Sequence, residues 1–169
     1  AGAVAARRER ERAAKAWPRG EEGAVAAIEK LRAEGGDEAV RSAVGAAAAL
    51  LNGIVNHPDD EKRRSIRFEN PRFQADVGRF GGGCECFFAA GFNLTHREGD
   101  QLDPETFKPL IEPFLILREP DPFKERDAWT LWFDTLGACA KFFEARAAEA
   151  GGTRKAAVGE APKWASRKY

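Results

Sequence analysis

Residues Asn56 to Phe73 read NHPDDEKRRSIRFENPRF, and this stretch decides the fold. It contains two prolines, Pro58 and Pro71, and each suits the first position of a helix, where a missing N–H costs little. Acidic residues follow Pro58 at positions 59–61, where the dipole of a helix favours negative charge. Asn70 stands directly before Pro71, as an N-cap residue does. The stretch therefore predicts two short helices in succession.

A concentrated basic group lies between the two expected helix starts, at Lys62, Arg63, Arg64 and Arg67. On a helix, Arg63 and Arg67 would share a face because they are four residues apart, and Ile66 would turn inward. Taken alone, such a run of charge indicates a solvated surface more often than a binding site.

The same stretch resembles a known family. The pattern Asn-x-Pro-Asp-Asp-Glu-Lys-x-Arg-Ser-Ile-Arg at residues 56–67, followed by Asn-Pro-x-Phe-Gln at residues 70–74, resembles the signature of the PUB domain, also called the PUG domain. Downstream, the sequence GCECFFAAGF at residues 83–92 is similar to a later helix of the family that ends in Gly-Phe. Both motifs occur in the family's order and near its spacing. The family occurs in peptide:N-glycanase, in certain UBX-containing adaptors and in the catalytic subunit of the linear ubiquitin ligase.

This resemblance implies a peptide-binding module that is not itself an enzyme. The family is best known for binding the C-terminal tail of the valosin-containing-protein type of AAA+ ATPase. Its ligands present an acidic residue, a leucine and a near-terminal tyrosine, and lysine and arginine suit the acidic group and the terminal carboxylate. We therefore expect an adaptor that binds this tail in ubiquitin-dependent quality control and ER-associated degradation. The expected location is the cytoplasm, with the nucleus left open.

The resemblance carries over to individual residues unevenly. Lys62, Arg67 and Asn70 match residues that line the family's peptide pocket. Arg63 stands where the family usually has a tyrosine, and Gly53 stands where the glycanase-type domain has an asparagine. Arginine keeps a planar face and adds a fixed positive charge, so we expect either a more acidic ligand or a weakened pocket. The predicted peptide-binding set is Asn52, Gly53, His57, Lys62, Arg63, Arg67, Asn70 and Arg72.

Length and charge exclude several classes of function. The chain has 169 residues, which predicts one domain with tails. Its 27 basic and 27 acidic residues cancel, so nothing in the overall charge supports nucleic-acid binding. No apolar run approaches the length of a membrane span, and no membrane role is expected. The start at Ala1 shows neither a methionine nor a signal-peptide pattern, and we interpret the chain as an excised piece.

The cysteines indicate neither a disulfide framework nor a metal site. Cys84, Cys86 and Cys139 are odd in number, which fits a reducing compartment inside the cell. Zinc needs about four ligands at defined spacing, whereas only His57 and His96 could complete the pair at Cys84 and Cys86. We therefore expect buried cysteines and no cofactor or metal, with a redox or metal protein as a third hypothesis. No nucleophile lies in a recognisable catalytic context, so no enzyme activity is expected.

Periodicity and turn signals predict a mainly helical fold with a small antiparallel sheet. Helices are expected at residues 22–33, ending at Gly35-Gly36, at 37–56, at 84–90, ending at Gly91, and from Asp121-Pro122 to about Glu149. Strands are expected at residues 92–97 and 114–117, with a turn at Glu98-Gly99-Asp100. A short helical turn is possible at residues 104–111. The stretch between Gly99 and Pro113 is longer than the family pattern and looks like an insertion.

These elements divide the chain into three parts. A charged N-terminal extension covers residues 1–21, a PUB-like domain covers 22–149, and a basic flexible tail covers 150–169. The final helix is apolar on two sides, with Trp129, Trp132 and Phe143 on one of them. Such a helix either lies between packing partners or keeps one face for another chain. The alternative function is therefore a scaffold or dimerisation domain of a larger protein, which self-associates through residues 129–143.

Overall fold

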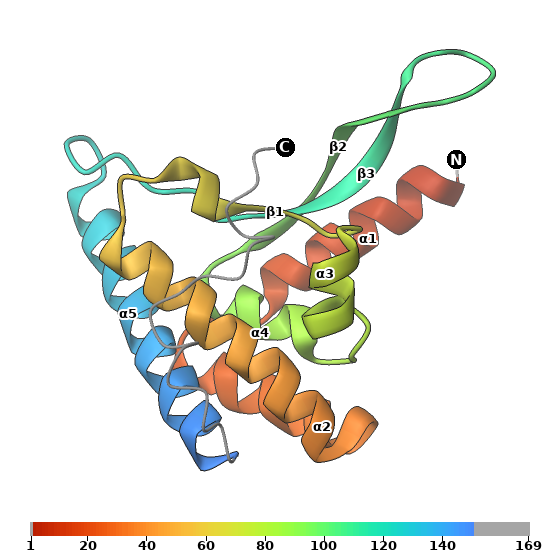
Figure 1. Cartoon of the computed structure of the whole chain (residues 1–169). Coiled ribbons are helices and arrows are strands. Elements are labelled where there is room, and N and C mark those ends of the chain that lie inside the picture. Colours follow the sequence, from red (N-terminus) through yellow and green to blue (C-terminus); the bar gives the residue numbers. More distant parts are fainter. Residues whose placement is uncertain (1, 151–169) are drawn as a thin grey trace.

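The structure is a computed structural model that describes residues 2–150. In chain order its elements are α1 (Gly2–Ala16), α2 (Glu21–Asn56), the 3-10 helix η1 (Glu61–Arg64), β1 (Ser65–Arg67), α3 (Pro71–Phe73), the π-helical turn η2 (Gln74–Gly78), α4 (Gly83–Ala90), β2 (Asn93–Leu102), β3 (Pro109–Ile116) and α5 (Arg126–Glu149). Helices dominate, and one three-stranded antiparallel sheet lies beside them (Figure 1). The predicted fold class is confirmed.

The central helix is α2, against which α4 and α5 pack (Figure 1). Six of its buried residues are alanines between Ala39 and Ala49, and these small side chains let the neighbouring helices approach closely. The expected break at Gly35-Gly36 becomes a kink within α2. Gly36 adopts φ 70° and ψ −163° there, a conformation that costs glycine little and other residues much.

The same helix corrects one expectation about membranes. By length and composition alone, α2 is long and apolar enough to cross a membrane, so the expectation that no run approaches this length is wrong. In the structure, however, 61% of its most apolar window is buried against the rest of the domain. Packing inside the protein therefore accounts for the larger share of the apolar window of α2.

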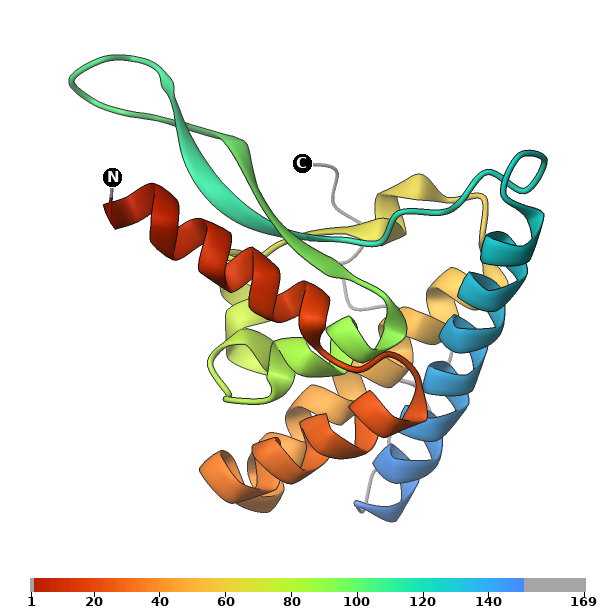
Figure 2. The same ribbon diagram turned by 180° about the vertical axis from the view of Figure 1, so that it is seen from behind.

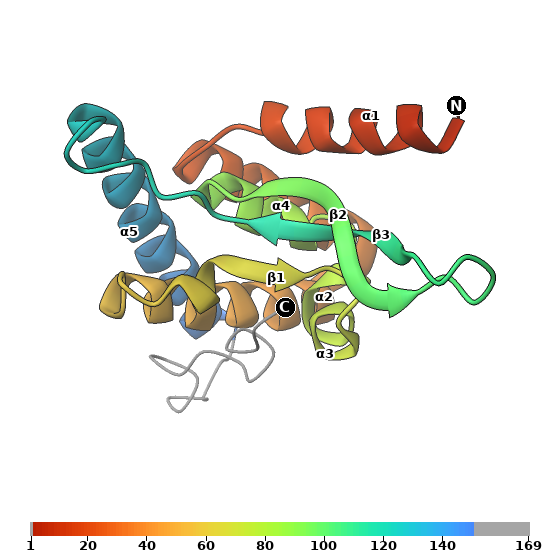
Figure 3. The same ribbon diagram turned by 90° about the horizontal axis from the view of Figure 1, so that it is seen from above.

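The sheet has the strand order β1-β3-β2, with β3 in the middle. Leu115 of β3 lies opposite Ile66 on one side and Leu94 on the other, and Leu115 and Ile66 are fully buried. Beyond β1, strands β2 and β3 continue as a hairpin that projects from the body (Figures 1 and 3). The sheet thus joins the segment after α2 to the hairpin.

One expectation about this hairpin is wrong, and a second needs a different end. Residues 98–100 do not form the turn, because β2 runs through them to Leu102 with a register shift between Glu98 and Leu102. The chain turns instead at residues 103–108, where Asp103 Oδ1 accepts hydrogen bonds from the backbone N–H groups of Glu105 and Thr106. The end of the stretch in which a helical turn was considered, residues 109–111, belongs to β3.

The segment after α2 also differs from prediction. Pro58 lies in a turn, and only the four-residue η1 follows, with Asp60 Oδ1 accepting from the N–H of Lys62 at 3.2 Å. The chain is already extended at Ser65, because pairing with β3 and burial of Ile66 stabilise a strand there. The expected helix from Pro58 is therefore wrong, and with it the shared helix face of Arg63 and Arg67.

Signals set by local chemistry are confirmed. Asn70 Oδ1 accepts hydrogen bonds from the N–H groups of Arg72 at 2.9 Å and Phe73 at 3.4 Å, and α3 begins at Pro71. Gly91 ends α4 at φ 116°, in the left-handed region. The last helix begins at Arg126 rather than at Pro122, because Asp121 caps a separate turn before it.

Helix α1 lies alongside β2 (Figures 2 and 3). Ala14 of α1 belongs to the buried core, and the side chain of His96 from β2 is enclosed near Arg10, 3.4 Å away, and Glu11, 3.7 Å away. Burial lowers the pKa of His96, and the Glu11 carboxylate opposes that shift. The predicted tail at 150–169 lies outside the described residues from position 151 onward.

Candidate peptide-binding site

The predicted site residues lie along consecutive elements rather than on one helix. Lys62 and Arg63 belong to η1, Arg67 ends β1, and Asn70 and Arg72 flank the start of α3. Figure 1 shows η1 above the C-terminal end of α2, with β1 leading away from it toward α3. We call residues 62–72 the basic strip. It combines positive charge with a backbone that pairs with β3 at residues 65–67.

Arg63 is partly neutralised by a neighbour. Its Nε donates a hydrogen bond to Asp60 Oδ2 at 3.1 Å, and its side chain is half-buried. Asp60 is also the N-cap of η1, so one carboxylate serves both the turn and the arginine. The Asp60 carboxylate therefore offsets part of the positive charge that Arg63 presents to a ligand.

Arg64, which was not predicted as a site residue, ties the strip to the body of the domain. Its Nη1 donates to the carbonyl oxygen of Pro58 at 2.6 Å, and its Nη2 lies 3.7 Å from Glu119 Oε1 in the segment after β3. Glu119 in turn accepts a hydrogen bond from Trp129 Nε1 of α5 at 2.9 Å. These contacts hold η1 between the end of α2 and the start of α5.

Arg67 is paired with a buried acid. Its Nε donates to Glu112 Oε1 of β3, and its Nη2 lies 4.0 Å from Glu69 Oε2. Glu112 is only 4% exposed, and the Arg67 side chain is 17% exposed. Gly99 leaves room for this pair, since a Cβ there would lie 1.9 Å from Glu112 Oε2. An ionised carboxylate so deeply buried requires such a partner.

The remaining predicted residues fall into two groups. His57, Lys62 and Arg72 are exposed, so their side chains are available to a ligand. Asn70 is 5% exposed, and its oxygen caps α3. Its first role in the structure is therefore to hold the start of α3.

The two residues from α2 lie apart from the strip's hydrogen bonds. Asn52 Nδ2 donates to Glu144 Oε2 of α5 at 3.4 Å, a contact with α5 rather than with the basic strip. Gly53 is buried, and its carbonyl oxygen accepts from the N–H of His57 at 3.0 Å where α2 ends. Both residues thus help to position the end of α2.

The three thiols are held in their neutral form. Burial raises the pKa of Cys84 and of Cys86, and it raises the pKa of Cys139 to about 11. Reactive and metal-binding cysteines act as thiolates, which these surroundings disfavour. Among residues 2–150, moreover, no group of three or more His, Cys, Asp or Glu side chains is arranged to hold a metal ion.

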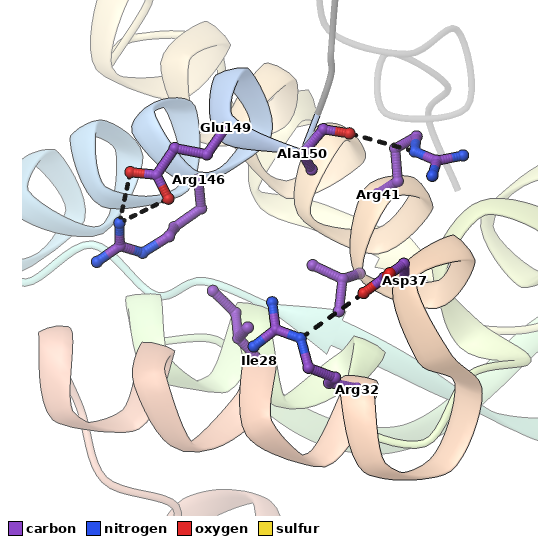
Figure 4. A pocket seen from close by; sticks show the side chains of 8 residues that line it. Ile28, Arg32, Asp37, Arg41, Arg146, Glu149 and Ala150 are labelled. Carbon is purple, nitrogen blue, oxygen red and sulfur yellow. Dashed lines mark hydrogen bonds and ion pairs between the residues drawn. The ribbon is translucent and has the colours of Figure 1, made fainter.

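A hollow of about 550 Å³ lies elsewhere, between α2 on both sides of its kink and the C-terminal end of α5 (Figure 4). Four of its charged groups form two pairs: Arg32 lies 3.8 Å from Asp37, and Arg146 lies 2.9 Å from Glu149. Arg41, which also lines the hollow, donates from Nε to the carbonyl oxygen of Ala150 at 3.3 Å. Its lining includes none of the predicted peptide-binding residues. This hollow therefore offers an acidic peptide little uncompensated charge.

Glu112 and Gly99 are the residues of the strip's surroundings that sequence reasoning missed. A signal was present, because Glu112 interrupts an apolar run from Leu110 to Leu115. An acid in a buried strand needs a basic partner, and the nearby motif was rich in arginine. The identity of that partner, Arg67, depended on the strand pairing of β1 with β3.

Comparison with known proteins agrees with this geometry. The model of the PUB domain family matches residues 37–125, which is more than half of the chain. The human protein UBX domain-containing protein 6 is 38% identical over 77 residues, or 45% of this chain, and the match covers 18% of that relative's length. The chain belongs to the PUB domain family. The predicted resemblance is confirmed: the chain carries a protein-interaction module, and the match indicates no catalytic family.

Proposed function

We propose that this PUB domain binds the acidic, tyrosine-bearing C-terminal tail of a valosin-containing-protein-type AAA+ ATPase. It would act as a cytoplasmic adaptor in ubiquitin-dependent protein quality control, including ER-associated degradation. The observation that supports this proposal is the basic strip, where exposed Lys62 and Arg72 lie at the two ends of a segment that includes β1.

In this mode of binding, the exposed cations meet the acidic residue and the terminal carboxylate of the peptide. Charge-assisted hydrogen bonds of this kind are worth about 1.5–3 kcal/mol at best, and less where water competes. The side chain of Arg63 supplies a planar face near the strip in place of the family's tyrosine. Affinity should fall as ionic strength rises, because both partners carry the relevant charges near the surface.

The test is isothermal titration of the tail peptide, with a scrambled peptide of the same composition as the negative control. Lys62→Ala and Arg72→Ala should each weaken binding several-fold and reduce its salt dependence. Lys141→Ala removes an exposed lysine from α5 and is the matched control, since it changes the same net charge away from the strip. Equal binding by all four proteins would place the peptide site elsewhere, and no binding by any would reject the proposal.

A second candidate, self-association through α5, rests on a separate observation. Leu131 of α5 is 69% exposed and Phe123 before it is 95% exposed, whereas Trp129 and Phe133 stack at 5.2 Å with an interplanar angle of 5°. Large exposed apolar side chains on a helix and directly before it suit an interface between chains. Sedimentation of the parent and of Leu131→Asp tests this candidate. If both proteins remain monomers at high concentration, self-association through α5 is rejected.

A further inference from the structure

Glu112 is a buried carboxylate that contacts an arginine of the basic strip. It lies on β3, the middle strand, two residues before Phe114, which pairs with Arg67 of β1. Its Oε1 accepts the hydrogen bond from Arg67 Nε. One arginine of the predicted site is thus already bound to a carboxylate that belongs to the domain itself.

The burial of Glu112 makes this pairing hard to exchange. If the Arg67 guanidinium turned to a carboxylate on a ligand, Glu112 would remain as a charge in a nearly closed site. Breaking one partner of a buried pair is far more costly than losing a surface pair. A ligand carboxylate in water gains too little from Arg67 to offset that cost. Arg67 therefore stays with Glu112 when a ligand binds.

The packing around Glu112 supports the same conclusion. Gly99, on β2, leaves the space that the carboxylate fills, and any larger residue there would collide with Oε2. Arg97 is the cross-strand neighbour of Glu112, and its guanidinium lies over the ring of Phe114 at 4.1 Å and donates to Ser65 Oγ at 3.2 Å. The Glu112 carboxylate thus lies in a closely fitted space between Arg67 of β1 and Gly99 of β2.

Resting on the proposed function, we propose that Glu112 is a specificity-determining residue of the basic strip. It acts as an internal counter-charge that holds the Arg67 guanidinium and lowers the positive potential there. Recognition of an acidic ligand then falls to exposed Lys62 and Arg72 at the ends of the strip. The site accordingly selects peptides whose acidic groups are spaced to reach these two side chains rather than peptides with a single acid at the centre.

The first experiment compares Glu112→Gln with the parent. Glutamine keeps the shape and the accepting oxygen but removes the charge, so Arg67 becomes available to an acid. The tail peptide should bind this variant about three- to tenfold more tightly at low salt, and the gain should shrink at high salt. A peptide in which each Asp and Glu is replaced by Asn and Gln should show no gain.

Glu98→Gln is the matched control, because it removes one negative charge from an exposed position in the same hairpin. If Glu112→Gln gains no more affinity than Glu98→Gln, or binds more weakly, the inference is wrong although the proposed function stands. If the parent does not bind the tail at all, the proposed function fails, and the second experiment decides the inference.

The second experiment does not need the tail. The Nε–Hε NMR signal of Arg67 in the parent, assigned by its loss in Arg67→Lys, is followed during titration with inorganic phosphate. It should stay unmoved at phosphate concentrations that shift the backbone amide signals of Lys62 or Arg72. In Glu112→Gln the same signal should move with them. An Arg67 signal that responds to phosphate in the parent would overturn the inference.

Discussion

Arg63 donates a hydrogen bond from Nε to Oδ2 of Asp60 over 3.1 Å, three residues back in the chain. The resemblance implies a tyrosine at position 63, so this contact belongs to the substitution that distinguishes the chain from its family. The same carboxylate caps η1. The arginine is therefore accommodated by an interaction that a tyrosine would not need.

Restoring the family residue should improve binding of the standard tail. Arg63→Tyr removes a charge, supplies a stacking ring and leaves Asp60 free to cap η1. We expect tighter binding with a shallower salt dependence, and a stability change within about 1 kcal/mol because the lost pair is an i,i+3 contact near the surface. Titration at two salt concentrations, with a melt of each protein, measures both. Weaker binding by the variant would show that the arginine itself contacts the ligand.

Removal of the N-cap side chain of Asn70 should lower the stability of the protein. Asn70→Ala leaves the N–H groups of Arg72 and Phe73 without their acceptor, at a cost of about 1 kcal/mol. Asn70→Asp keeps an accepting oxygen at the same place and should lose less. Urea denaturation of the three proteins gives the comparison, and a loss as large in Asn70→Asp as in Asn70→Ala would contradict the capping role.

Gly99 should tolerate no side chain. A Cβ at this position would lie 1.9 Å from Glu112 Oε2, so Gly99→Ala must displace a buried carboxylate from Arg67. We expect a loss of about 1–3 kcal/mol, as for other overpacked sites. Gly45→Ala is the control, since nothing lies within 4 Å of a Cβ there and a helical glycine gains about 0.5–1 kcal/mol on replacement by alanine. Equal stability of the two variants would contradict the close approach at Gly99.

The docking of α1 on β2 should weaken in acid. The pKa of His96 is lowered in the folded protein below its ordinary value of 6.5, chiefly by burial. The folded state therefore prefers neutral His96, and the stability from its burial is present above pH 6.5 and is lost as pH falls below that value. Glu11 beside the ring limits the loss, and Arg10 adds to it.

The measurement for His96 is the melting temperature between about pH 8 and pH 5. The parent should lose more stability over this range than His96→Gln, in which no imidazole is protonated. His57→Gln removes the exposed histidine at the end of α2 and controls for the substitution. Parallel curves for the parent and His96→Gln would show that the ring does not resist protonation.

Features with local causes were predictable, and features with distant causes were not. Asn70, Pro71 and Gly91 act within one helical turn, so their roles could be predicted from neighbouring residues. The strand at Ser65 depends on Ile66 pairing with Leu115, far along the chain, and the local pattern pointed to a helix instead. Long-range pairing overrode local propensity at this point.

The site follows the same division. The motif identified Lys62, Arg67 and Asn70 from their order in the sequence, and the chain's membership in the family is shown. Their status as peptide contacts stays a prediction. The pairing of Arg67 with an acid could not be predicted. Glu112 comes from the stretch that looks like an insertion, and it meets Arg67 only through the sheet.

The hydrophobic core extends beyond both ends of the family match at residues 37–125. Leu31 precedes the match, Leu136 and Phe143 follow it, and all three are fully buried in the same cluster as the matched residues. A fragment cut at the matched ends would therefore lose α5, which forms one wall of the core around α2. We expect that fragment to melt without a cooperative transition. An engineer who moves this module into another protein must accordingly carry both flanking segments with it, because the unit that folds is longer than the unit that sequence similarity marks out.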